Sequence, residues 1–255
     1  MNIGNNVGRI SYNCDIVFTI IDIKDNIAIL QGKYIRLIAD SPITDLIEIK
    51  NEELTQYEEA DRKYQKKIID SYKDKISHIT GKILHIDSDN EYLDKCLNLY
   101  KSLNLYAQGI IIQEENIYKD IISLIQKYRP NIVVLTGHDS YNKKDKYDLN
   151  NYRNSLNFMK AVIKIREYYS LDDICVYAGA CGSNFEALIA SGANFASSID
   201  RKNIEAYDPA IVAILAAITP FDRIIDIQNV YSFSKMKKGG IGGIETYGKM
   251  RLLVK

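Results

Sequence analysis

The sequence predicts an α/β fold in which a small β-barrel module precedes a three-layer domain built on a parallel sheet. Two observations carry this prediction. Residues 1–50 alternate short Ile- and Val-rich runs with Asp-Asn and Gly turn signals, which is typical of antiparallel strands. Beyond residue 80, apolar runs of strand length alternate with segments of helix length, and this alternation implies parallel strands joined by right-handed helical crossovers.

The first part of the chain divides into a module and a linker. Turn signals at Asp25-Asn26 and Gly32 separate its apolar runs, as expected for a small antiparallel sheet or barrel over residues 1–50. Residues 51–79 are dense in Glu, Lys, Asp and Arg and keep only a partial apolar stripe, which predicts a mostly solvated linker helix. The α/β domain then occupies residues 80–255.

Strands and helices are expected to alternate along this domain. In chain order they are strand 82–86, helix 91–103, strand 108–112, helix 117–128, strand 131–136, helix 152–168, strand 174–178, helix 184–190 and strand 194–196. Asp208-Pro209, a favourable N-cap followed by a first-turn proline, predicts a further helix to Ile218. This helix is apolar all round and is therefore expected to be buried.

Composition excludes several classes of function. The 33 basic and 33 acidic side chains give a formal net charge of +0 at pH 7, so no broad basic surface is expected to bind nucleic acid. Cysteines 14, 96, 175 and 181 form no C-x-x-C pair or Cys/His cluster, which argues against a metal site or a disulfide framework and favours a reduced, cytoplasmic protein. We expect no cofactor, no signal peptide and no membrane insertion, because the longest apolar run, 210–218, is too short to span a bilayer.

Residues that can carry chemistry stand at the carboxyl ends of three predicted strands, where sites form in open α/β sheets. The first strand ends in Asp87 and Asp89, the third in Gly137-His138-Asp139, and the fourth in Gly179-Ala180-Cys181-Gly182. These strand ends are neighbours in a simple doubly wound sheet. The sequence therefore predicts a thiol, an imidazole and two carboxylates at one rim.

Cys181 is the candidate nucleophile of this rim. It stands at a strand-to-helix turn that we expect to be exposed, and Ser183-x-x-Glu186 directly after it has the form of a capping box. The positive end of the following helix would favour the thiolate that a nucleophilic cysteine needs. His138, upstream of Cys181, is the candidate general base.

Other interpretations of these residues remain open. A cysteine among small residues is most often a buried filler, and this is the role expected for Cys175. His78 and His85 are expected to be structural. A non-peptidase alternative is a flavodoxin-like or receiver-like domain that uses Asp87 and Asp89 to bind a metal or a phosphoryl group.

The order of the motifs, Gly137-His138 before Ala180-Cys181, resembles that of caspase-type cysteine peptidases, whose Cys follows Ala and whose His lies roughly 50 residues upstream. Glutamine amidotransferases place their His after the Cys and match less well. Nearly the whole chain is similar to the YabG sporulation-specific peptidases of endospore-forming bacteria. The similarity is carried by residues 7–40, 135–139, 178–181, 185–188, 192–198 and 242–251.

This resemblance implies a caspase-like fold and a cysteine endopeptidase made in the mother cell of a sporulating bacterium. It implies that the substrates are spore coat and germination-related, cortex-lytic precursor proteins, cleaved after Arg. Matched motif to motif, Cys181 is the nucleophile and His138 the general base. A structural coat protein that functions through its N-terminal module is a further alternative, and such a protein needs no reactive thiol.

Backbone groups around the two catalytic candidates are expected to form the oxyanion hole. The donors would be N–H groups at Gly182 and near His138, at Gly137 and Asp139. Caspase-type enzymes have Gly directly after the catalytic His, whereas this chain has Asp139, which leaves the position of the second donor open.

Recognition of Arg needs a carboxylate in the first specificity pocket. Asp87 and Asp89 are the candidates, and Gly179, the residue before Ala-Cys, would leave room in the pocket without supplying charge. Asp89 has a structural alternative as the N-cap of the helix that follows it.

Overall fold

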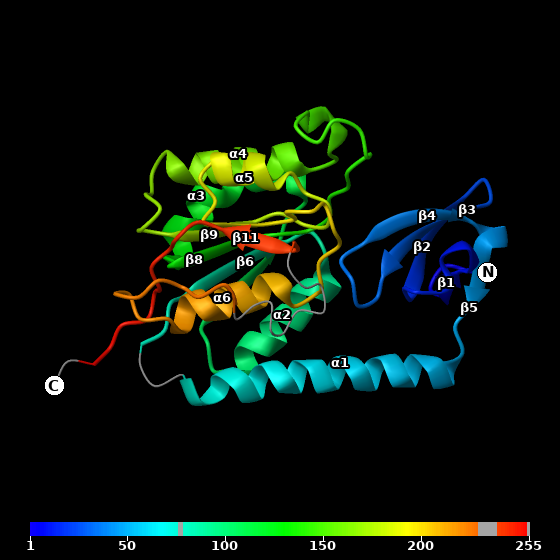
Figure 1. Cartoon of the computed structure of the whole chain (residues 1–255), viewed down its shortest axis with the longest axis horizontal. Helices are drawn as coiled ribbons and strands as arrows, with labels where there is room; N and C mark the ends of the chain where they lie inside the picture. The colour runs from blue at the N-terminus through cyan, green and yellow to red at the C-terminus, as the bar shows by residue number, and fades with distance from the viewer. Residues whose placement is uncertain (76–78, 229–238, 254–255) are drawn as a thin grey trace. The chain divides into compact units, whose positions relative to one another are not determined.

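The computed structural model describes residues 1–75, 79–228 and 239–253 of this mixed α/β protein. The chain divides into two compact units, Met1–Lys67 and Ile68–Lys255 (Figure 1). Their boundary falls within helix α1 (Asn51–Tyr72), which begins in the first unit and ends in the second.

The first unit contains an antiparallel sheet with the strand order β4-β3-β2-β1-β5. The strands are β1 (Asn6–Arg9), β2 (Phe18–Lys24), β3 (Ile27–Gly32), β4 (Ile38–Pro42) and β5 (Leu46–Glu48). Its buried core consists of Val7, Phe18, Ile20, Ala28, Leu30 and Leu46. Burial alternates along β3, so that Ala28 and Leu30 lie in this core while Ile27 and Ile29 are half-buried.

The hairpin between β2 and β3 forms at the predicted turn. Asp25 and Asn26 have φ angles of 47° and 64°, the left-handed conformation that a two-residue hairpin turn requires, and Lys24 pairs directly with Ile27. The predicted antiparallel sheet is therefore present, and because no pair joins β4 to β5 among the described residues, its closure into a barrel is not confirmed.

The second unit is built on a sheet with the order β11-β10-β9-β8-β6-β7. The strands are β6 (Ile83–Asp87), β7 (Ala107–Ile111), β8 (Ile132–Leu135), β9 (Cys175–Ala178), β10 (Phe195–Ser197) and β11 (Ile241–Gly243). The first five are parallel, as predicted. Numbered along the chain they follow the order 2-1-3-4-5 of a doubly wound sheet, which reverses direction between β6 and β8.

The edge strand β11 was not predicted, and it runs antiparallel to β10. Its sequence, Ile-Gly-Gly, is too short and too poor in side chains to show a strand period. The glycine is needed at Gly243, because a Cβ there would lie 2.3 Å from the ring of Phe195 on the neighbouring strand.

Helices cover both faces of this sheet in Figure 1, with α3, α4 and α5 on one side and α2 and α6 on the other. They are α2 (Asn90–Ser102), α3 (Ile117–Tyr128), α4 (Ser155–Arg166), α5 (Phe185–Ala190) and α6 (Asp208–Ile218). Short 3-10 turns occur at Ile10–Tyr12, Ile43–Asp45, Lys73–Lys75, Glu114–Asn116 and Leu149–Asn151. No helix in the described part of the chain is both long and apolar enough to cross a membrane.

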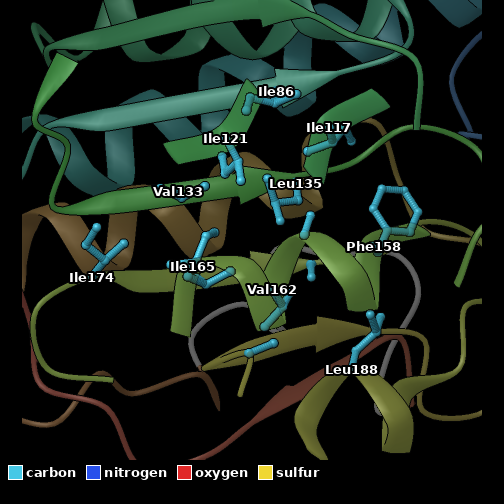
Figure 2. Close-up of a cluster of buried hydrophobic side chains, with 14 of the residues drawn as sticks. Ile86, Ile117, Ile121, Val133, Leu135, Phe158, Val162, Ile165, Ile174 and Leu188 are labelled. Carbon is cyan, nitrogen blue, oxygen red and sulfur yellow. The ribbon is translucent and has the colours of Figure 1, made fainter. Parts of the chain in front are cut away.

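The main core lies between the sheet and the helices α3 and α4 (Figure 2). Val133 and Leu135 of β8 meet Ile121 of α3 and Phe158 and Val162 of α4, and all five side chains are buried. This apolar layer fixes β8, the strand that leads to His138. Helix α6 is buried along its whole length, as its apolar sequence predicts.

Three predicted helix starts are wrong in detail. The helix expected from Tyr152 begins at Ser155, because Tyr152 is extended and stacks on Tyr141. Tyr207 is the N-cap of α6, and Asp208 lies in the first turn. The predicted capping box before α5 does not form, since the side chain of Asn184 accepts the N–H of Ala187 and caps the helix instead.

Candidate active site

Three polar residues occupy equivalent positions beyond three neighbouring strands. Ile86 of β6 pairs with Leu135 of β8, and Leu135 pairs with Ala178 of β9. Three residues beyond these paired positions stand Asp89, His138 and Cys181. The fold therefore brings the predicted strand ends to one edge of the sheet, at the reversal of strand order where doubly wound proteins place their sites.

His138 is held through its backbone as well as its ring. Its N–H donates to Glu114 Oε1 over 2.7 Å, and its carbonyl accepts from Asn154 Nδ2 over 2.8 Å. Its ring packs against the edge of Tyr92, with the ring centres 6.0 Å apart. Gly137 lets the chain pass this close, because a Cβ there would lie 2.4 Å from Glu114 Oε1.

Asp89 contacts both a helix end and His138. Its Oδ1 accepts the N–H groups of Glu91 at 2.9 Å and Tyr92 at 3.2 Å, which confirms the predicted N-cap role. Its Oδ2 lies 3.1 Å from Nε2 of His138, a contact that the sequence did not predict. The imidazole is therefore tied to the first turn of α2.

Asp87 is fully buried and engaged by the protein itself. Its Oδ1 accepts the N–H of Asp89 at 3.0 Å, and its Oδ2 lies 3.8 Å from Nε2 of His85, whose Nδ1 is 2.9 Å from the hydroxyl of Tyr100. His85 is thus part of the core, as expected. His78, the other histidine interpreted as structural, lies outside the described residues.

Cys181 is covered, in contrast to the exposed turn that we expected. Its side chain is 2% exposed, and its Sγ accepts the N–H of Ile204 at 3.2 Å. The N–H of the next residue, Gly182, donates to the carbonyl of Lys202 at 3.2 Å. We call the backbone of Lys202 to Ile204 the covering segment. It forms hydrogen bonds with both the candidate nucleophile and a candidate oxyanion donor.

The family model described as YabG peptidase U57 matches residues 2–255. The chain belongs to the YabG peptidase family. The sporulation-specific protease YabG of Bacillus subtilis (strain 168) is 39% identical to it over an alignment of 279 residue positions, gaps included. The alignment covers 98% of this chain and 96% of that protein. No solved structure matches the chain. Membership in a peptidase family confirms the resemblance found in the sequence and disfavours the flavodoxin-like or receiver-like alternative.

Asp139 joins the two loops of this candidate site. Its Oδ2 accepts the hydroxyls of Ser155 at 2.5 Å and Ser183 at 2.8 Å, and its Oδ1 accepts the N–H of Asn154 at 2.7 Å. Ser183 lies in the turn that carries Cys181. Burial raises the pKa of the Asp139 carboxyl, while these hydrogen bonds oppose that shift. The carboxylate thus links the loop after β8 to the turn after β9.

Gly179 is required by its surroundings. It has a φ of 111°, and a Cβ there would lie 2.9 Å from atoms of both Leu188 and Ser197. A side chain at this position would therefore collide with the neighbouring residues.

Two features of this candidate site could not be predicted from the sequence. Glu114, which holds the backbone of His138, is one of several acidic residues in a polar turn and has no distinguishing signal. The covering segment follows β10 without any periodic pattern. The Asp89–His138 contact depends on the register of β6 and β8, which the sequence pattern does not supply.

The cysteines should differ in reactivity. Burial raises the pKa of Cys175 to about 12, so this thiol stays protonated and inert near neutral pH. We expect iodoacetamide at pH 8 to alkylate the half-buried Cys14 first, Cys181 more slowly and Cys175 last, as followed by peptide mass spectrometry. Alkylation of Cys181 ahead of Cys14 would show that the covering segment opens readily in solution.

Proposed function

We propose that this YabG-family chain is a cysteine endopeptidase in which Cys181 is the nucleophile and His138 is the general base and acid. The observation that supports it best is the shared register of Asp89, His138 and Cys181 beyond β6, β8 and β9. A thiol, an imidazole and a carboxylate in one row at the end of a parallel sheet are the groups that thiol-dependent hydrolysis of a peptide bond uses.

The proposed reaction begins when His138 accepts the proton of the Cys181 thiol. The thiolate attacks the scissile carbonyl carbon, and the oxyanion that forms is stabilised by the N–H of Gly182 and by backbone N–H groups at Gly137 or Asp139. The imidazolium then donates its proton to the leaving amine as the C–N bond breaks. A water molecule, deprotonated by His138, hydrolyses the thioester and restores the thiol.

Substrate binding requires the covering segment to move. The Gly182 N–H donates to Lys202, and the Cys181 Sγ accepts from Ile204, so a scissile carbonyl cannot reach either group until those contacts break. A single donor of an oxyanion hole contributes about 3 kcal/mol to catalysis in a comparable hydrolase. Displacement of the carbonyl of Lys202 from Gly182 is therefore part of the proposed activation.

Cleavage after Arg, in spore coat and germination-related precursor proteins within the mother cell, completes the proposal and rests on the family resemblance. Asp87 and Asp89 remain the candidate Arg ligands near the strand ends. Because Asp87 is buried against Asp89 and His85, its carboxylate can receive a substrate side chain only if the turn between β6 and α2 opens.

The carboxylates of Asp87 and Asp89, which form the alternative metal or phosphoryl site, already have partners within the protein. In residues 1–75, 79–228 and 239–253, no group of three or more His, Cys, Asp or Glu side chains is arranged to hold a metal ion. Both carboxylates are instead engaged by backbone N–H groups and histidine rings.

The test is to incubate the wild type and Cys181→Ala with a mixture of folded and denatured proteins and to identify new termini by mass spectrometry. New termini that follow Arg, produced by the wild type alone, are expected. Cys175→Ala is the matched control, because it removes an inert thiol and should leave cleavage intact. Identical termini from Cys181→Ala would exclude Cys181 as the nucleophile.

A further inference from the structure

We propose that Asp89 is the positioning residue of His138 and that it selects the imidazole tautomer in which Nδ1, and not Nε2, is the base. The inference rests on the proposed function, because it assigns the nitrogen that receives the proton of Cys181. It assigns Asp89 to His138 in place of substrate Arg, which leaves Asp87 as the candidate Arg ligand.

The contact itself defines the tautomer. Asp89 Oδ2 lies 3.1 Å from His138 Nε2, and the carboxylate is 6% exposed. An ionised carboxylate can only accept hydrogen bonds, so Nε2 must carry the hydrogen that it donates to Asp89. In the neutral imidazole the lone pair is then on Nδ1.

The surroundings of the other ring nitrogen, Nδ1, agree with this assignment. His138 Nδ1 is buried, and it has no hydrogen-bond partner among the residues that the structure describes. A buried nitrogen that lacks a partner is costly unless a ligand or a reacting group supplies one. The thiol of Cys181, which follows the next strand at the same offset, is the group proposed to supply the proton.

Asp89 is itself held rigidly enough to position a ring. Its Oδ1 caps α2 through two backbone N–H groups, and its own N–H donates to Asp87 Oδ1 at 3.0 Å. The carboxylate is thus fixed between the end of β6 and the first turn of α2. An imidazole anchored to such a group loses little freedom in the transition state.

Two other carboxylates near His138 are committed elsewhere. The Oε1 of Glu114 accepts the backbone N–H of His138 and the hydroxyl of Ser88. The oxygens of Asp139 accept from Ser155, Ser183 and backbone N–H groups. Asp89 is accordingly the carboxylate that contacts the ring.

The substitution Asp89→Asn tests the positioning of His138 while keeping the N-cap of α2. Asn is as good an N-cap as Asp, so its Oδ1 can continue to accept the N–H groups of α2. Its Nδ2 then faces His138 as a donor and stabilises the opposite tautomer, with the hydrogen on Nδ1. The same exchange in a Ser-His-Asp triad lowers kcat about 10⁴-fold through the wrong tautomer, and we expect kcat to fall about 10²- to 10⁴-fold here with KM little changed.

The decisive readout is the tautomer, measured by nitrogen NMR of histidine-labelled protein, with His138→Gln to assign the signal among the three histidines. We expect Nε2–H in the wild type and Nδ1–H in Asp89→Asn, with equal urea midpoints. Asp89→Ser retains a capping side chain and removes the contact with His138, so it should lose kcat without forcing the Nδ1–H tautomer.

The outcomes separate this inference from the proposed function. If Cys181→Ala is inactive while Asp89→Asn keeps the wild-type kcat and tautomer, Asp89 does not position His138 and the peptidase proposal stands. If Cys181→Ala cleaves as well as the wild type, the peptidase proposal itself is wrong. An Nδ1–H tautomer in the wild-type protein would overturn the inference directly.

Discussion

Replacing Cys181 or His138 with Ala should lower kcat/KM by at least about 10⁴-fold, and replacing both should lower it no further. The reason is that the two side chains act as one unit. Without the imidazole no base accepts the proton of the thiol, and without the thiol the imidazole has no nucleophile to activate. The measurement is the initial rate of hydrolysis of a fluorogenic peptide with Arg at the scissile bond.

The controls test whether the loss is chemical. Cys96→Ala and Cys175→Ala change buried thiols of the same domain and should retain most of the activity. If the fold-losses of the two single variants multiply in the double variant, Cys181 and His138 act independently. That result would contradict the proposed proton transfer between them.

The strand ends that meet at the site could be predicted because the local apolar runs and the general rule for doubly wound sheets point to the same residues. Apolar runs located β6, β8 and β9 to within a residue or two, and the rule for doubly wound sheets placed their carboxyl ends together. The N-cap role of Asp89 followed from its position alone. Its contact with His138 depends on strand register, which alternation of strands and helices does not supply.

The exposure of Cys181 could not be predicted because it depends on residues that are distant in the chain. The turn after β9 has the small residues of an exposed elbow, yet Lys202 and Ile204 cover it through backbone groups, whatever their side chains are. Closure of the first sheet into a barrel could not be decided from the sequence for a related reason. Turn signals identify hairpins, whereas closure needs β4 to pair with β5, and no local pattern encodes that pair.

The hydrogen bonds of the Asp139 side chain could not be predicted from the sequence either. From the sequence we considered its backbone N–H as an oxyanion donor, whereas the partners of its side chain, the hydroxyls of Ser155 and Ser183, are known from the structure alone. These hydroxyls come from the start of α4 and the turn before α5, which only the folded sheet brings together. A stability role for Asp139 follows from the structure and was absent from the sequence analysis.

Asp139→Ala should lower the free energy of unfolding at pH 7 by about 3 kcal/mol or more, because an unsatisfied buried donor costs about 1–3 kcal/mol and this change leaves several. Two of them are the hydroxyls of Ser155 and Ser183, and another is the N–H of Asn154. Urea unfolding measures the change, and Ala at the exposed Asp222 should cost less than about 0.5 kcal/mol. An equally small cost for Asp139→Ala would contradict the network.

Asp139 should also make the stability of the fold depend on pH, in a direction that follows from its raised pKa. Burial raises the pKa of Asp139 in the folded protein, so the folded state holds this proton more tightly than the unfolded chain does. Protonation of Asp139 therefore stabilises the fold below the ordinary Asp pKa, and that contribution is lost as the pH rises through the raised value. In Asp139→Asn, which cannot titrate, this loss is absent, so the stability of the wild type relative to the variant should fall between pH 3 and 7. A relative stability that instead rises over this range would show that the hydrogen bonds from Ser155 and Ser183 outweigh burial and lower the pKa of Asp139.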